Sequence, residues 1–195
     1  MLEPYKHKHL SVEEIPWSRL GKLLIELAKA IRKDWWPDIV VGIAKGGVIP
    51  AVYVSSLFQL DFYPIKLSSR FKEKIVHENP IWHVYPTSHV EGKKVLLVDD
   101  ICVAGRTLKI ATSELKKQGV KEVRSATLAV HEESVFPNYW VLKTDALIVW
   151  PWDRDVLSED GIWSINPEYL EEMRKVSKYI PGPSPAIEPE GNWIK

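Results

Sequence analysis

Apolar and polar residues follow one another along the chain in the pattern of an α/β protein. Between residues 16 and 33 the apolar positions recur every three or four residues, which predicts an amphipathic helix with a proline in its first turn. Short continuous apolar runs, typical of buried strands, come later and are separated by helical segments. The predicted strands are 39–43, 62–67, 94–99, 123–130 and 146–149, and the helices between them are 48–60 and 107–118. This alternation predicts a doubly wound, mainly parallel α/β sheet, which binds ligands beyond the carboxyl ends of its strands.

Two other segments have a different pattern. Residues 68–91 are mostly polar, and a loop of that length is usually either a functional lid or disordered. Near the end of the chain, Asn166 is positioned to cap a helix over 167–178. Four prolines in 181–189 favour an extended segment there. We find no internal repeat and expect one domain over 1–195.

Composition narrows the class of protein. The 195 residues include 26 basic and 26 acidic side chains, and the resulting zero net charge argues against a nucleic-acid partner. The one cysteine, Cys102, cannot form an internal disulfide. No apolar run approaches the roughly 18–20 residues that span a bilayer, and residues 1–10 lack the apolar core of a signal peptide. We therefore expect a cytoplasmic protein that binds neither nucleic acid nor a membrane.

The clearest chemical signal comes at the end of the predicted strand 94–99. Two adjacent carboxylates, Asp99 and Asp100, are followed by a turn of small residues that leads into the next predicted helix. Adjacent carboxylates can accept hydrogen bonds from sugar hydroxyls or hold a hydrated Mg²⁺. Backbone N–H groups at a helix N-terminus can bind a phosphate. The alternative is structural, because a pair of aspartates after a strand can also cap and solubilise a turn.

The whole string 95–108, VLLVDDICVAGRTL, resembles the signature with which type I phosphoribosyltransferases bind 5-phosphoribosyl-1-pyrophosphate (PRPP). Residues 42–51, GIAKGGVIPA, are similar to the pyrophosphate loop of the same family. The resemblance implies transfer of the phosphoribosyl group from PRPP to a base, with release of pyrophosphate and formation of a nucleoside 5′-monophosphate. It also implies Mg²⁺ as cofactor and a homodimer.

The resemblance implies a role for each matching residue. The catalytic group would be Asp99, Asp100 and Lys45, and the two aspartates would also hold Mg²⁺, largely through PRPP and water. The 5′-phosphate would be bound by Val103, Ala104, Gly105, Arg106 and Thr107. The pyrophosphate would be bound by Ala44, Lys45, Gly46, Gly47, Ser68, Ser69 and Arg70, the last three at the start of a loop that closes over the substrate. The Ala44–Lys45 peptide bond is expected to be cis.

Residues 148–153, IVWPWD, are similar to the base-binding hood of the xanthine-guanine branch. This implies a purine base, specifically a 6-oxopurine such as hypoxanthine, guanine or xanthine, under a small hood from about 1–15 and 150–195, with a core of about 36–150. The candidate base-binding residues are His131, Ile148, Trp150, Trp152 and Asp153. The two tryptophans can equally pack in the core, and a lone histidine is often structural.

Three positions depart from the 6-oxopurine pattern. Val103 occupies the position at which those enzymes have an aspartate near purine N7. His131 occupies the position of a lysine that contacts the 6-oxo group, and Leu147 occupies the position of an aromatic residue that stacks on the base. PRPP binding is therefore expected, whereas the base is open. Two alternatives are a non-catalytic regulatory protein that binds PRPP or a nucleotide, and a phosphoribosyltransferase for another base, such as adenine or a pyrimidine.

Overall fold

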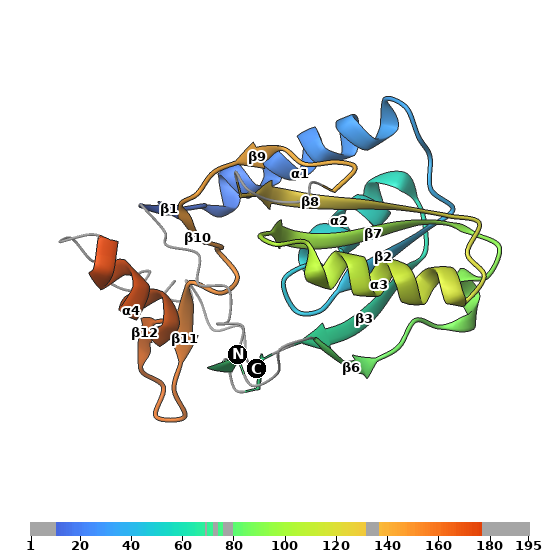
Figure 1. Ribbon diagram of the computed structural model, residues 1–195. Coiled ribbons are helices and arrows are strands. Elements are labelled where there is room, and N and C mark those ends of the chain that lie inside the picture. Colours follow the sequence, from blue (N-terminus) through green and yellow to red (C-terminus); the bar gives the residue numbers. More distant parts are fainter. Residues whose placement is uncertain (1–10, 69, 72–73, 76–79, 132–136, 177–195) are drawn as a thin grey trace, which may run out of the picture. The chain divides into compact units, whose positions relative to one another are not determined.

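The computed structural model describes residues 11–68, 70–71, 74–75, 80–131 and 137–176 (Figure 1). Contacts divide the chain into two compact units. Of the described residues, the first unit contains those within 21–144 and the second contains 11–20 and 145–176. A single domain over 1–195 stays a prediction. Within the described part of the chain, no helix combines the length and the apolar character that crossing a membrane requires.

A six-stranded sheet forms the centre of the first unit. Its strands lie in the order β6-β3-β2-β7-β8-β9, and all neighbours are parallel except β6, which is antiparallel to β3. The strands are β2 (Ile39–Ile43), β3 (Phe62–Ser68), β6 (Ile81–Val84), β7 (Lys94–Cys102), β8 (Glu122–Val130) and β9 (Leu142–Lys143). The prediction of a mainly parallel α/β sheet is confirmed.

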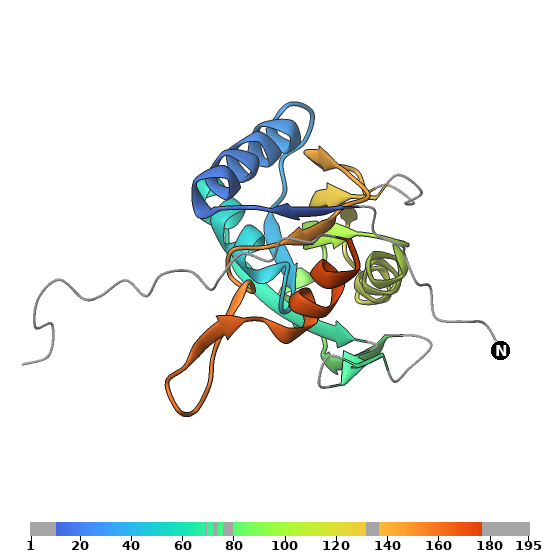
Figure 2. The same ribbon diagram turned by 90° about the vertical axis from the view of Figure 1, so that its left-hand side faces the viewer.

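Two helices, α2 (Val48–Phe58) and α3 (Arg106–Lys117), cover opposite faces of this sheet, as Figures 1 and 2 show. Each follows a central strand, as the pattern predicted, and α1 (Trp17–Arg32) precedes β2. All residues of β2 are buried, as are Leu108, Ala111 and Leu115 on the inner face of α3. Burying a leucine side chain stabilises a fold by roughly 1.5–3 kcal/mol. The two helices therefore hold the ends of β2 and β7 in place.

Strand β7 is longer than predicted. The apolar pattern ended the strand at Asp99, but it continues to Cys102, and Ile101 and Cys102 pair with Ala129 and Val130 of β8. Two acidic side chains interrupt an apolar run without interrupting backbone pairing. Because β8 extends equally far, it supplies partners along the whole strand.

Residues 68–91 are not one loop, which corrects the expectation from their polarity. They contain β6, two short paired strands, β4 (Arg70–Phe71) and β5 (Lys74–Ile75), and a 3₁₀ helix, η1 (Ser88–Val90). Strand β6 lies at the edge of the sheet, where only one side is paired. An edge strand needs no continuous apolar run, so the sequence pattern did not identify it.

The second unit contains two small sheets and a helix. Strand β1 (Val12–Glu14) pairs in parallel with β10 (Leu147–Val149), and β11 (Asp155–Leu157) pairs antiparallel with β12 (Trp163–Ile165). The strand predicted at 146–149 therefore exists, but it pairs with β1 rather than with the main sheet. Helix α4 (Pro167–Val176) begins after Asn166, whose side-chain oxygen accepts the N–H of Glu168 at 3.1 Å, which confirms the cap. The predicted extended segment 181–189 lies outside the described residues.

Candidate active site

Strands β2 and β7 are neighbours, but the chain continues from them in opposite directions across the sheet. Strand β2 leads to β3 on one side and β7 leads to β8 on the other. In open α/β sheets, ligands bind beyond the strand ends at such a switch point. The loop 44–47 follows β2, Asp99 and Asp100 lie in the last part of β7, and the Ala44–Lys45 peptide bond is cis, as predicted. The fold thus brings together two candidate elements from distant parts of the sequence.

The glycines of the 44–47 loop lie directly against the two aspartates. A Cβ atom built on Gly46 would lie 2.8 Å from Oδ1 of Asp100 and closer still to Oδ2. A Cβ atom on Gly47 would lie 2.8 Å from Cα of Asp99 and 2.8 Å from the carbonyl oxygen of Ile43. Real Cβ atoms do not approach other atoms so closely. Backbone atoms block a Cβ at position 47, which therefore requires glycine, whereas a Cβ at position 46 would require the Asp100 side chain to move. The loop backbone thus contacts the end of β7.

The carboxylates of Asp99 and Asp100 are half-buried. Oδ1 of Asp99 accepts the N–H of Asp100 at 3.0 Å, and Oδ1 of Asp100 accepts the N–H of Ile101 at 2.7 Å. Burial, and after it the negative charge of Asp100, raises the pKa of the Asp99 carboxyl well above its ordinary value. A cation or a hydroxyl-bearing ligand would relieve this repulsion, and carboxylate oxygens are ligands that Mg²⁺ prefers. The pair therefore fits Mg²⁺ chemically, although no group of three His, Cys, Asp or Glu side chains among the described residues could hold a metal ion.

The turn after β7 prepares the N-terminus of α3 for an anion. Gly105, the N-cap residue, has a left-handed φ of 70°, a conformation that glycine adopts without strain. No side chain forms a cap hydrogen bond there, and the first turn contains no acidic residue. The first N–H groups of a helix have no intrahelical partner and form the positive end of its dipole. This geometry suits a phosphate, as the predicted role of residues 103–107 requires.

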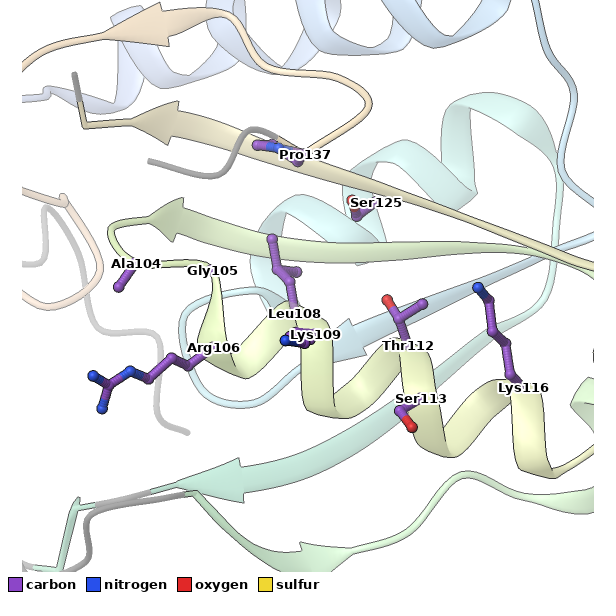
Figure 3. Close-up of a pocket in the computed structure, with 10 residues that line it drawn as sticks. All are labelled: Ala104, Gly105, Arg106, Leu108, Lys109, Thr112, Ser113, Lys116, Ser125 and Pro137. Carbon is purple, nitrogen blue, oxygen red and sulfur yellow. The ribbon is translucent and has the colours of Figure 1, made fainter. Parts of the chain in front are cut away.

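A cavity of about 640 Å³ borders this turn and extends along α3 (Figure 3). Its described lining includes three basic side chains, three hydroxyls and no acidic side chain. The lining residues are Ala104, Gly105, Arg106, Leu108, Lys109, Thr112, Ser113, Lys116, Ser125 and Pro137. The cavity therefore favours a negatively charged ligand.

The remaining residues of the predicted pyrophosphate site lie at the end of β3 and beyond it. Ser68 is the half-buried last residue of β3, and Arg70 is the first residue of β4. Ser69 lies outside the described residues. A role for this segment as a closing loop stays a prediction.

The residues predicted to contact the base fall in both compact units. His131 follows β8, its N–H donates to the carbonyl oxygen of Cys102 at 3.1 Å, and its side chain is fully buried. Ile148 and Trp150 are buried in the second unit. The half-buried Trp152 stacks on Trp150, with ring centroids 5.1 Å apart and planes at 7°. The two tryptophans thus form one stacked pair, in which Trp150 is buried and Trp152 is partly exposed.

Asp153 is held by helix α4. Its Oδ2 accepts the hydroxyl of Tyr169 at 3.0 Å, and its Oδ1 lies 3.4 Å from Nδ2 of Asn166. The same Nδ2 donates to the backbone oxygen of Asp153 at 3.0 Å. Sequence reasoning identified Asn166 as a helix cap but missed its contact with Asp153, and it missed Tyr169 altogether. No local pattern in the sequence links residues so far apart.

Three comparisons place the chain among known proteins. The family model described as "Phosphoribosyl transferase domain" matches residues 15–159. The crystal structure of a purine phosphoribosyltransferase from Pyrococcus horikoshii superposes with a TM-score of 0.66 and 31% identity, covering 76% of this chain and 98% of that chain. An adenine phosphoribosyltransferase of Campylobacter fetus is 28% identical over 116 residues, which are 55% of this chain and 64% of the relative. The transcriptional regulator GfcR of Thermoplasma acidophilum is 29% identical over 92 residues, which are 47% of this chain and 43% of the regulator.

The chain thus spans less than two thirds of the length of these two curated relatives. The family match, however, covers most of the chain and includes both loops at the switch point. The chain therefore belongs to the phosphoribosyl transferase domain family.

Proposed function

We propose that the protein transfers the 5-phosphoribosyl group from PRPP to a purine base, releasing pyrophosphate and forming a nucleoside 5′-monophosphate. The close contact of Gly46 and Gly47 with Asp99 and Asp100 carries the proposal. This contact joins a backbone loop suited to pyrophosphate with carboxylates suited to ribose hydroxyls. Family membership and similarity to a purine phosphoribosyltransferase support the same activity.

In the proposed reaction a ring nitrogen of the base attacks C1 of PRPP as the bond to pyrophosphate breaks. Positive charge develops on the ribose and negative charge on the leaving group. Lys45 and Gly46 stabilise the pyrophosphate. The N–H groups of Ala44 and Gly47 are used within the fold, because they donate to the carbonyl oxygens of Ile65 and Ile43 at 2.8 and 2.9 Å. Asp99 and Asp100 hold the ribose hydroxyls and favour the cationic sugar. The turn 103–107 anchors the 5′-phosphate and so orients C1.

Mg²⁺ is the proposed cofactor. Asp99 and Asp100 would hold it, largely through PRPP and water. Bound there, the ion supplies positive charge that stabilises the pyrophosphate.

The base is proposed to be a 6-oxopurine, with adenine as the alternative. Stacking on an aromatic side chain contributes roughly 1–3 kcal/mol per base, and the partly exposed Trp152 of the stacked pair offers such a surface. Similarity to an adenine phosphoribosyltransferase supports adenine as the alternative base. The residues proposed to contact the base are His131, in the first unit, and those of 148–153, in the second.

The activity is tested by measuring PRPP-dependent release of pyrophosphate with hypoxanthine, guanine, xanthine, adenine and uracil, each with saturating Mg²⁺. The Asp99→Asn, Asp100→Asn double variant is the matched control, because asparagine keeps the shape and removes the charge. We expect turnover with at least one purine by the wild type and none by a folded double variant. Turnover with uracil alone would contradict the purine assignment.

A second candidate is a non-catalytic protein that binds PRPP or a nucleotide and regulates another process. Similarity to the regulator GfcR and the valine at position 103 favour it. Calorimetric titration with PRPP and Mg²⁺ separates the two candidates. Binding without turnover of any base would support the regulator and refute the enzyme.

We also propose a homodimer. On the outer side of α2, Val52, Tyr53 and Leu57 are 42%, 37% and 49% exposed. Neighbouring exposed apolar side chains often mark an interaction surface. Light scattering should give the mass of two chains for the wild type and of one chain for Leu57→Lys. A monomeric wild type would contradict the proposal.

A further inference from the structure

The segment Trp150–Asp153 forms a tight turn whose last residue is tied to helix α4. The N–H of Asp153 donates to the carbonyl oxygen of Trp150 at 3.2 Å, which closes the turn. Tyr169 donates to one carboxylate oxygen of Asp153, and Asn166 reaches the other oxygen and the backbone carbonyl. Side chains of one helix thus contact both the carboxylate and the main chain of the turn.

We infer that Asp153 does not read the base, and that it links the aromatic turn to α4, with Tyr169 and Asn166 as positioning residues for base binding. The inference rests on the proposed function. Tyr169 of α4 donates to Oδ2 of Asp153 at 3.0 Å, and Nδ2 of Asn166, the residue before α4, lies 3.4 Å from Oδ1, so each carboxylate oxygen already has a partner inside the protein. Contact with the base then falls to the partly exposed indole of Trp152 and to the backbone of the turn.

The residues that hold the turn are themselves anchored. Asn166 uses its side-chain oxygen to cap α4 and its backbone N–H to bond the carbonyl oxygen of Arg154 at 2.8 Å. The guanidinium of Arg154 donates to Glu14 at 2.8 Å and to Asp155 at 2.7 Å. Because each of these groups makes several bonds, α4 cannot shift without breaking others. A binding turn held by such supporting hydrogen bonds loses little conformational entropy when a ligand binds.

Tyr169→Phe tests the inference by removing one hydroxyl and leaving the ring. A hydrogen bond to a charged group is among the stronger ones, and losing it frees one carboxylate oxygen of Asp153 to move. We expect the KM for the base to rise about tenfold, while kcat and the KM for PRPP stay within about twofold of the wild type.

Two substitutions of Asp153 separate a link from a direct contact. Asparagine keeps one oxygen that accepts the Tyr169 hydroxyl, and Asn166 can still bond the backbone oxygen. Asp153→Asn should therefore raise the base KM by about threefold, less than the tenfold or greater rise expected for Asp153→Ala. Equal losses in the two variants, combined with a wild-type KM in Tyr169→Phe, would show that the charge touches the base and would overturn the inference.

Tyr139→Phe is the matched control. The hydroxyl of Tyr139 also donates to a carboxylate at 3.0 Å, that of Asp34, but in the first compact unit. It also contacts Arg124, whose guanidinium lies 5.0 Å from the ring centre of Trp35. This variant should lose stability and leave the KM for the base unchanged.

A spectroscopic measurement keeps the inference testable if the wild type transfers no base. In protein labelled with 5-fluorotryptophan, Trp150→Phe and Trp152→Phe assign the two ¹⁹F resonances of the stacked pair. Tyr169→Phe should shift these two resonances, whereas Tyr139→Phe should shift that of Trp35. Unmoved Trp150 and Trp152 resonances in Tyr169→Phe would overturn the inference even if base transfer is confirmed. Absence of turnover with shifted resonances would refute only the proposed function.

Discussion

Gly46→Ala is the substitution whose effect the structure defines most closely. The added methyl group would overlap the carboxylate of Asp100, lying 2.8 Å from Oδ1 and closer still to Oδ2. The obstructing atoms are at the end of a side chain, so rotation of Asp100 can relieve the overlap. That rotation moves the carboxylate away from the position proposed to hold the ribose.

The expected costs follow from which atoms must move. Overpacking destabilises a protein by roughly 1–3 kcal/mol. Because Asp100 can rotate away, we expect Gly46→Ala to lie at the low end, at about 1 kcal/mol, which lowers Tm by about 2–4 °C for a chain of this length. Gly47→Ala meets backbone atoms of Asp99 and Ile43, which cannot rotate away. It should therefore cost about 3 kcal/mol, or about 6–12 °C.

Gly46→Ala should weaken PRPP binding even though its expected cost in stability is small. A displaced Asp100 loses a charge-assisted hydrogen bond to PRPP, which corresponds to a rise in Kd of about ten- to a hundredfold. Calorimetric titration with PRPP and Mg²⁺ measures this, and thermal melts measure Tm. Gly21→Ala is the control, because Gly21 lies in the second turn of α1 and a Cβ atom there meets nothing within 4 Å. It should raise Tm slightly through helix propensity and leave the PRPP affinity unchanged.

A Gly46→Ala protein with wild-type PRPP affinity would refute the assignment of the Gly46–Asp100 contact to the substrate site. A Gly46→Ala protein that loses more stability than Gly47→Ala would refute the argument that side-chain rotation relieves the overlap. In both cases the thermal melt of Gly21→Ala serves as the control, because this variant should change Tm only slightly.

Three further substitutions test the site. The pKa of Asp99 in the folded chain lies above its value of about 3.9 in the unfolded chain. At pH values between these two pKa values the folded chain therefore binds more protons than the unfolded chain. As a result, the free energy of unfolding falls as pH rises through this range. Asp99→Asn should therefore have a higher Tm than the wild type at pH 7 but not at about pH 3, and an equal difference at both pH values would contradict this. Gly105→Val forces a β-branched residue to the φ of 70° and should weaken PRPP and nucleoside monophosphates together while leaving affinity for the free base, as titrations with each ligand would show. His131→Ala should raise the KM for the base about ten- to a hundredfold and leave that for PRPP, and a lower Tm with an unchanged base KM would assign this fully buried side chain a structural role.

The sequence alone was sufficient for the class of fold and for the strand, turn and helix of the proposed PRPP site. The string 95–108 contains a buried strand, two carboxylates, a small-residue turn and a helix start in continuous order, so each part is visible locally. The helices after β2 and β7 and the cap at Asn166 were predictable for the same reason, since each depends on neighbours a few residues away. The expected cis peptide bond at Ala44–Lys45 came from family resemblance rather than from any local rule.

Pairing partners were decided by the tertiary structure. The apolar run at 146–149 indicated a strand but not which strand would pair with it, and its partner, β1, is too short to have a pattern of its own. The edge strand β6 was hidden in a polar segment because only one of its sides is paired. Backbone pairing also extended β7 beyond Asp99, although its side chains turn polar there.

The sequence by itself determined which segments are buried and where the backbone turns, because apolar period and turn residues act over a few positions. Only the tertiary structure decided that Gly46 lies against Asp100 and that Asp153 is held by Tyr169. These contacts join residues far apart in the chain, and they form only when strands and helices have packed. Their energies depend on side-chain geometry within an ångström, which no pattern of apolar and polar positions encodes.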